Sequence, residues 1–567
     1  CLPFVWAFCG CVAQLKRVLP TDIPVQYSFL NRATLLHWAA AGGHLDCIKC
    51  LLDLGANVNA KDAEGGSPLH YAIYCEKMDA AILLLQNGAN PNALDQVECS
   101  PLTEACLRTN QELLHKLFEF GASIRSSDPR NIEIVHLACF CFKEDDSVIR
   151  YLVDSKGGNP DACDLNRFRP IHNASLSGNL PALRFLIEKN VRLDEGDHVN
   201  STPLIFSCFR DQVECTQLLV ESGADIHCFE KHGLTALHVA SRYGSRCVQY
   251  LAPLFSTLNA LNGAEFTPLQ FAILHRNINS TRILLESGAD PETPSQFGST
   301  AILYAAVDDF FEAAQVLIEQ HDANANQPDK DGNTALHLVS MFGFEDTARV
   351  LLDLHAIPNL RNEKRQLPIH HAASRGQECV LRLLLEKMKR VEIPAEDGID
   401  ACDVSGRTAL HCCAMTGCLG CVEALLQFGC NVDILDAHLL TPLMEAVRWG
   451  HKDVTSKLLQ AGAFPHLCSP EGENPCREVF TARHLSAGTI SSLRLVLEHS
   501  NLLLGEYCGM YKILDAYFKQ LVFLGEIAPH SPCSWDLQRL RPRPTDTRWV
   551  GQEGDNSSSG GQPSSGV

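Results

Sequence analysis

The chain has 567 residues, of which 46% are apolar and 20% are charged, and this composition is typical of a folded globular protein. Its 67 acidic and 47 basic residues give a net charge of −20, and this sign argues against nucleic acid as a main partner. No stretch contains the roughly 18 uninterrupted apolar residues that a membrane-spanning helix requires, so we expect no membrane span.

The cysteine content indicates a reducing compartment. The 26 cysteines are spread singly through helical stretches, in a chain too long to depend on disulfides for its stability. We therefore expect reduced thiols and a location in the cytosol or the nucleus.

The first residues do not resemble a secretion signal. Residues 1–13 are apolar, but no basic region precedes them. The sequence begins at Cys1 rather than Met, as we expect of a fragment. We interpret residues 1–30 as a partial or N-terminal capping copy of the repeat that follows.

A four-residue motif recurs thirteen times along the chain. Its typical form is Ser-Pro-Leu-His at residues 67–70 and Thr-Ala-Leu-His at residues 334–337. Successive copies start 32 to 36 residues apart, with one step of 41. The copies start at Thr34, Ser67, Ser100, Glu133, Arg169, Thr202, Thr235, Thr267, Thr300, Thr334, Leu367, Thr408 and Thr441.

Each copy has the composition of a helix pair. Thr or Ser can cap the first helix, and Pro at its first position loses no hydrogen bond. An apolar helix ending in Leu-Leu follows, and a Gly-Ala-Asn or Gly-Ala-Asp turn closes the copy, as at residues 55–57 and 223–225. Left-handed turns are predicted at Gly55, Gly88, Gly121, Gly223, Gly288, Gly429 and Gly462.

Over residues 31–463, about three quarters of the chain, the sequence resembles the ankyrin-repeat family. The resemblance implies an all-α solenoid of about thirteen helix-turn-helix repeats joined by β-hairpin loops, and a monomer stabilised by contacts between neighbouring copies. It also implies that the motif histidine hydrogen-bonds backbone between repeats. These histidines are His37, His70, His136, His172, His238, His337, His370 and His411.

Two interruptions and a C-terminal region complete the prediction. Eight extra residues within 387–403 predict a longer second helix followed by an exposed loop. Residues 464–527 are interpreted as a degenerate repeat starting at Thr481 and a helical C-terminal cap. Residues 528–567, rich in Pro, Arg, Ser and Gly, predict a disordered tail. The copies between Ser100 and Asp164 depart most from the motif, so we expect this part of the stack to open first.

The sequence offers no set of catalytic residues. Residues 47–50 and 418–421 have the Cys-x-x-Cys spacing of half a zinc site, but no second ligand pair lies at a usable distance. Cysteines at 139, 141, 412 and 413 are interpreted as small apolar residues packed between repeats. No phosphate-binding glycine loop, nucleophile elbow or kinase signature is present. We expect no enzyme activity, no cofactor and no metal ion.

The resemblance places the binding surface on the concave face, at the hairpin tips and the last residues of each first helix. These helix positions are rich in aromatic residues, Met and Arg, the types enriched at interface centres. The predicted partner-binding residues are Tyr74, Arg108, Phe209, Arg210, Arg242, Tyr243, Met341, Phe342, Arg375, Arg448 and Trp449. The acidic net charge favours a partner that carries a basic segment.

The resemblance also implies a modification. The family's oxygen-dependent asparaginyl hydroxylase favours a Leu eight residues before its target Asn. Leu51 stands at that distance from Asn59, and Leu84 from Asn92. Both asparagines are therefore predicted targets.

The leading functional prediction is a non-catalytic scaffold that binds protein partners on the concave face. One alternative is the substrate-recognition subunit of a cullin-type ubiquitin ligase, since residues 531–540 resemble the start of the box that recruits elongin and cullin in some relatives. That segment lacks the Leu-Cys-Arg core of the box. Another alternative is the cytosolic ankyrin arm of a larger kinase, channel or ligase, of which this sequence is a fragment.

Overall fold

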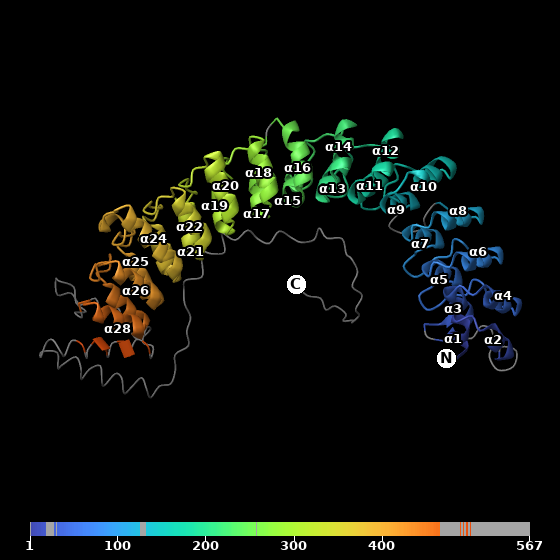
Figure 1. Ribbon diagram of the computed structural model, residues 1–567, viewed down its shortest axis with the longest axis horizontal. Coiled ribbons are helices and arrows are strands. Elements are labelled where there is room, and N and C mark those ends of the chain that lie inside the picture. Colours follow the sequence, from blue (N-terminus) through green and yellow to red (C-terminus); the bar gives the residue numbers. More distant parts are fainter. Residues whose placement is uncertain are drawn as a thin grey trace, which may run out of the picture.

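The computed structural model describes residues 2–18, 28–29, 31–124, 132–256 and 258–464, together with six single positions between 488 and 499. Thirteen pairs of antiparallel helices follow one another from Leu35 to Gln460. Figure 1 shows these pairs stacked in a single row that bends into an arch. The all-α solenoid predicted from the repeat is confirmed.

The first helices of the pairs line the inner side of the arch, as Figure 1 shows for the central copies. They are α3 (Leu35–Gly42), α5 (Pro68–Tyr74), α7 (Pro101–Leu107), α9 (Ile134–Cys141), α11 (Pro170–Ser177), α13 (Pro203–Phe209), α15 (Ala236–Tyr243), α17 (Pro268–Leu274), α19 (Ala301–Val307), α21 (Ala335–Phe342), α23 (Pro368–Arg375), α25 (Ala409–Thr416) and α27 (Pro442–Trp449).

The second helices form the outer row. They are α4 (Leu45–Asp53), α6 (Met78–Gln86), α8 (Gln111–Glu119), α10 (Ser147–Arg150), α12 (Leu180–Glu188), α14 (Val213–Glu221), α16 (Ser245–Leu251), α18 (Ile278–Glu286), α20 (Phe311–His321), α22 (Glu345–Asp353), α24 (Glu378–Arg390), α26 (Leu419–Gln427) and α28 (Lys452–Gln460). An additional pair, α1 (Leu2–Phe8) and α2 (Val12–Val18), packs against α3 and α4 at the N-terminal end.

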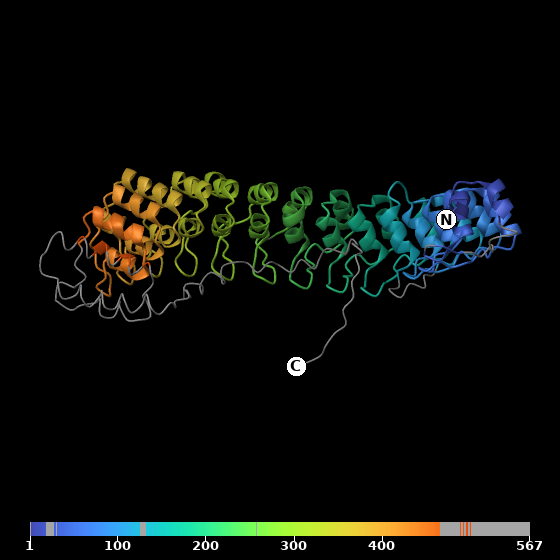
Figure 2. The ribbon, with the colours of Figure 1, turned by 90° about the horizontal axis from the view of Figure 1, so that it is seen from below.

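The hairpin loops project from one edge of the arch, as Figure 2 shows. Within the described part of the chain, strand pairing is limited to β1 (Ser28–Phe29) with β2 (Ala33–Thr34) and to one bridge between Phe229 and Thr235. Most loops are organised instead by an acidic or amide side chain five residues before the helix cap. In one loop, Asp197 Oδ1 accepts backbone N–H groups of Val199 at 3.0 Å and Ser201 at 2.8 Å.

The turn that closes each copy requires a left-handed residue. The seven glycines predicted to adopt this conformation all have φ between 83° and 96°. A Cβ added at Gly55 or Gly223 would meet no atom within 4 Å, so the backbone angle alone selects glycine there.

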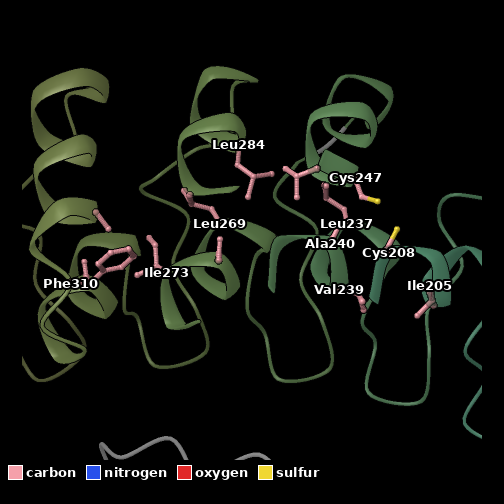
Figure 3. Packing of buried hydrophobic residues seen from close by; sticks show 14 of the residues in the cluster. Ile205, Cys208, Leu237, Val239, Ala240, Cys247, Leu269, Ile273, Leu284 and Phe310 are labelled. Atoms are coloured by element: carbon pink, nitrogen blue, oxygen red, sulfur yellow. The ribbon is translucent and has the colours of Figure 1, made fainter. Parts of the chain in front are cut away.

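A single apolar core runs the length of the stack. It begins at Phe4 and continues through every copy to Ala463, with Val496 beyond it. Figure 3 shows how side chains of the central copies, among them Leu237, Leu269 and Leu284, meet between the two helix rows. Each helix pair buries its apolar face on its neighbours, as expected of a solenoid.

The two irregular regions differ in structure. At the predicted insertion, α24 extends over 13 residues and is followed by an exposed loop containing a 3-10 turn (Ala395–Asp397), which confirms the prediction. In the fourth copy, the second helix is the four-residue α10 continued by a π-helix (Tyr151–Ser155). In the seventh copy, a three-residue 3-10 helix (Ala252–Leu254) follows α16. The degenerate repeat from Thr481, the helical cap and the tail at 528–567 lie outside the described residues, apart from the single positions already given.

Candidate partner-binding surface

The motif histidines are structural. His238 Nδ1 accepts the backbone N–H of Thr235 at 3.3 Å, and its Nε2 donates to the carbonyl of Phe266 in the next hairpin at 3.0 Å. Burial lowers the pKa of His238 and His337 to about 4 and that of His172 to about 3. These rings are therefore neutral at pH 7, and the prediction that they bond backbone between repeats is confirmed.

The concave surface presents one side chain per copy at the seventh position after the helix cap. Near the N-terminal end this position holds Tyr74, Leu107 and Phe140, which are 63%, 49% and 45% exposed. In the central copies it holds Phe209 and Arg242, which are partly buried. A row of apolar and aromatic groups thus follows the inner helices.

The structure brings four of the predicted residues together at the ends of α13 and α15. We call Phe209, Arg210, Arg242 and Tyr243 the central cluster. The Phe209 and Tyr243 rings lie with centroids 4.5 Å apart, and the guanidinium carbon of Arg242 lies 4.7 Å from the centre of the Tyr243 ring. Arg210 lies over Phe209 at 5.6 Å. Tyr243 keeps 41% of its surface exposed, so it both packs on its neighbour and faces solvent.

The central cluster is positively charged. Among the described residues, neither Arg210 nor Arg242 has a carboxylate within ion-pair distance. On the adjoining copy, burial and the charge of Arg242 lower the pKa of His275 to about 4. The cluster therefore combines two contacting, tilted aromatic rings with two guanidinium groups that have no acidic partner among the residues that the structure describes.

Other predicted residues lie apart from this cluster. Met341 and Phe342 belong to α21, and α17 and α19 stand between α15 and α21 in the stack. The Phe342 ring stacks on Phe344 with centroids 5.6 Å apart. His275 and Asp308 occupy the corresponding positions of the two intervening copies, so Met341 and Phe342 do not adjoin the central cluster.

The remaining predicted residues form local pairs or stand alone. The guanidinium of Arg108 lies 4.4 Å from the centre of the Tyr74 ring and pairs with Glu104 at 2.9 Å. At the other end, Trp449 Nε1 donates to Glu445 Oε2 at 3.0 Å, and Arg448 lies 3.8 Å from Glu445 Oε1. Arg375 is exposed.

Sequence reasoning missed the exposure of Phe140 and Cys141. Their neighbour Cys139 is fully buried, as predicted, but Phe140 is exposed and Cys141 is only partly buried. The two residues stand seven and eight positions after Glu133, so counting from the helix cap would have found them despite the unusual cap residue.

The two candidate hydroxylation targets connect neighbouring hairpins. Asn59 Nδ2 donates to the carbonyl of Gly88 at 3.1 Å, and Asn59 Oδ1 accepts the N–H of Asn90 at 2.7 Å. Asn92 repeats both bonds with Gly121 and Ser123, at 3.0 and 2.7 Å. Both asparagines are exposed on the hairpin edge.

In the parts of the chain that the structure describes, no three His, Cys, Asp or Glu side chains are grouped so as to hold a metal ion. The same residues contain no helix long and apolar enough to cross a membrane. A surface depression of 560 Å³, lined by Phe255, Leu258, Asn259 and Gly288 among others, shares no residue with the concave row.

Known proteins resemble the chain in its repeats. Mouse (Mus musculus) inversin is 27% identical over 274 residues, which are 47% of this chain and 22% of inversin. The E3 ubiquitin-protein ligase KEG of Arabidopsis thaliana is 27% identical over 343 residues, 57% of this chain and 21% of the ligase. The chain therefore spans about a fifth of these relatives.

A solved ankyrin repeat domain, that of Bcl-3, is 28% identical and covers 40% of this chain and 98% of its own, with a TM-score of 0.35. A family model described as ankyrin repeats (3 copies) matches residues 5–95, 36–128, 135–230, 227–295, 292–362 and 369–467. These matches cover most of the sequence and coincide with the stacked helix pairs, so the chain belongs to the ankyrin-repeat family.

Proposed function

We propose that the chain is a non-catalytic scaffold that binds protein partners along its concave surface, with the central cluster as the main contact. The observation that carries the proposal is the contacting pair of Phe209 and Tyr243 rings, tilted by 57° to each other, flanked by Arg210 and Arg242 and left partly open to solvent. Aromatic and Arg side chains at the centre of a surface contribute most of the affinity in protein interfaces. Reduced cysteines support a location in the cytosol or nucleus.

The charge distribution refines the partner's chemistry. Arg210 and Arg242 favour carboxylate or carbonyl oxygens in the partner segment that covers them. The rest of the chain is acidic, with a net charge of −20, so Lys or Arg in the flanking parts of the partner would be attracted to it. A partner with a basic segment remains part of the proposal, but those basic residues belong beside the cluster rather than on it.

The outer row offers a matched control for the test. Helix α15 carries Arg242 and Tyr243 on the inner row, and α16 of the same copy carries Arg246 and Tyr250 on the outer row. Partners of the full chain would be identified by proximity labelling and their affinity measured with purified proteins. We expect Arg242→Ala with Tyr243→Ala to weaken binding about thirtyfold, corresponding to about 2 kcal/mol, and Arg246→Ala with Tyr250→Ala to change it little. Equal effects of the two double variants would refute the concave site.

A ubiquitin-ligase role is the second candidate. It rests on residues 531–540, which lie outside the described residues, and on the similarity to a plant E3 ubiquitin-protein ligase. Co-purification of elongin and cullin with the unaltered chain, lost on deletion of residues 531–567, would establish this role.

Because relatives such as inversin are much longer, an arm of a larger kinase or channel is a further candidate, which full-length transcript sequencing would test.

The repeat array is assigned to residues 31–463 and is proposed to be a monomer, which sedimentation would test.

Asn59 and Asn92 are proposed targets of an asparaginyl hydroxylase. Their exposure on the hairpin edge supports access, whereas their bonds to the next hairpin require local opening first. Peptide mass spectra from normoxic cells that lack an added oxygen at both sites would refute the modification.

A further inference from the structure

A backbone hydrogen bond joins the tips of neighbouring hairpins along much of the stack. The N–H four residues before one helix cap donates to the carbonyl three residues before the preceding cap, over 2.7 to 3.1 Å. The bonds run from Ala63 to Asn31, Gln96 to Glu64, His198 to Asn166, Lys231 to Val199, Gly263 to His232, Glu363 to Asp331, Val404 to Lys364 and Ala437 to Ser405. Each bond couples one tip to the next, so the projecting edge in Figure 2 is connected laterally.

The ninth hairpin, residues 294–299 before the cap Thr300, lacks this bond on both sides. The N–H of Gln296 does not donate to Ala264 in the eighth hairpin, and that of Lys330 in the tenth does not reach Phe297. Among the boundaries whose two groups are both described, these are the only two without the bond. The exposed side chain of Lys330 donates to the carbonyl of Gln296 instead, so a long flexible side chain replaces a backbone contact.

The residue that organises the hairpin differs in this copy. Most hairpins have an Asp, Asn or Glu five residues before the cap, which accepts the N–H of the residue just before the cap. The ninth copy has Ser295 there, whose hydroxyl lies 2.8 Å from Tyr304 Oη and accepts the N–H of Phe297 at 3.4 Å. The N–H of Ser299 has no acceptor among the described residues. The single, short hydroxyl therefore holds the tip weakly.

The second copy shows the same site with a carboxylate. A tyrosine again stands four residues after the cap, and Tyr71 Oη donates to Asp62 Oδ2 at 2.8 Å. Asp62 Oδ1 accepts the N–H groups of Glu64 at 2.9 Å and Gly66 at 2.7 Å. The tip of this hairpin is bonded to both of its neighbours. One carboxylate thus binds the tyrosine and the tip together.

The base of the ninth hairpin, unlike its tip, is fixed on both sides. Gln270 Nε2 in the eighth copy donates to the carbonyls of Thr293 at 2.7 Å and Ser299 at 3.3 Å. Glu292 Oε1 accepts the N–H of Asn324 in the following turn at 2.8 Å. Helix α19 packs against both α17 and α21. The stack is therefore continuous at this copy, and only the tip lacks backbone attachment.

We propose that the tip of the ninth hairpin, residues 296–298, pivots about its base between two or more positions while the neighbouring hairpins stay in place. Few bonds to neighbours and exposed side chains characterise the mobile parts of folded proteins. Phe297 is 52% exposed, so the moving element presents an aromatic ring at the hairpin edge. The motion does not depend on the proposed binding function; under that function, it lets this edge adapt to the shape of a partner.

The test compares equivalent label pairs in the ninth and second copies of the full chain. Keto amino acids are incorporated at Phe297 and Glu319, or at Glu64 and Gln86, and coupled to nitroxides, which leaves the cysteines unlabelled. The two pairs occupy the same positions relative to their caps, and all four residues are exposed. Double electron–electron resonance gives the distance distribution. We expect the ninth-copy distribution to be at least about twice as wide as the second-copy one.

Exchanging the hairpin residue should exchange the behaviour of the two copies. Ser295→Asp supplies the carboxylate that the second copy has, and should narrow the ninth-copy distribution to the second-copy width. Asp62→Ser should broaden the second-copy distribution. Ser287→Asp is the control, because it adds the same charge at an exposed position outside the hairpin, and it should change neither distribution.

Equal widths for the two label pairs in the unsubstituted hairpins would overturn the proposal. So would a ninth-copy distribution that stays broad in Ser295→Asp although the circular dichroism of the variant matches the parent. If Ser295→Asp does not fold, Asp62→Ser decides, and a second-copy distribution that it leaves narrow would overturn the proposal as well.

Discussion

Replacing two buried histidines by glutamine should make the solenoid less sensitive to acid. His238 and His337 are fully buried, and their pKa values of about 4 lie well below the ordinary 6.5 that they would have in the unfolded chain. Above pH 6.5 both states are neutral, and the effect is absent. As the pH falls below 6.5, the unfolded chain takes up protons that the folded chain does not, so stability is lost progressively until about pH 4.

The magnitude follows from these values. Between pH 7 and pH 5, protonation of the unfolded state costs about 2 kcal/mol per histidine, or about 4 kcal/mol for the two. One copy of the chain carries a neutral glutamine at the position that the motif histidine occupies in other copies. In the eighth copy, Gln270 Oε1 accepts the N–H of Thr267 at 3.1 Å and its Nε2 donates to the carbonyls of Thr293 and Ser299 at 2.7 and 3.3 Å, which reproduces the histidine contacts.

The assay is urea unfolding at pH 7 and pH 5, followed by far-UV circular dichroism, with hydrogen exchange of α15 and α21 to report the two affected copies locally. We expect His238→Gln with His337→Gln to be within about 1 kcal/mol of the parent at pH 7 and to lose about 4 kcal/mol less on acidification. The exposed His198→Gln is the control and should behave as the parent does. If the double variant loses stability as steeply as the parent, buried neutral histidines are not the origin of the acid sensitivity.

Three further outcomes are expected. Leu284→Ala, at a fully buried position between the helix rows, should cost about 2 to 5 kcal/mol in urea unfolding, whereas the exposed Leu261→Ala should cost little; similar costs would contradict the assigned packing. Asp197→Ala should destabilise its hairpin by about 1 to 3 kcal/mol through two unpaired N–H groups, but Asp197→Asn should be tolerated because Asn262 performs the same role, with hydrogen exchange of residues 197–202 as the readout. Hydrogen exchange should also show α9, α10 and the π-helix opening before the central copies, and uniform protection along the stack would refute this.

The repeat pattern was sufficient to predict the helix pairs because the same motif recurs thirteen times along the chain. Even where Glu133 and Arg169 replace the capping Thr, the helix begins at the expected place, since His136 and His172 accept the backbone N–H of these cap residues at 3.1 and 3.0 Å. The hairpin carboxylates, such as Asp197, were visible in the sequence at a fixed distance before each motif, but their role depends on a loop conformation that periodicity does not reveal.

The candidate site was predicted only in outline. Counting along the first helices placed Phe209 and Tyr243 on the concave face, yet their contact depends on rotamers and on the spacing of adjacent copies. Such pairings between copies are set by the curvature of the stack, which no single copy encodes.

The loop after α24 shows where the protein tolerates added length. Although the eight extra residues fall between the eleventh and twelfth copies, His370 Nε2 still reaches the carbonyl of Ala401 in the next hairpin at 3.0 Å. The inner helices on either side, α23 and α25, remain packed together. This loop is therefore a suitable attachment point for a fluorophore or affinity tag, through which partner capture could be followed in cells while the inner row stays unaltered.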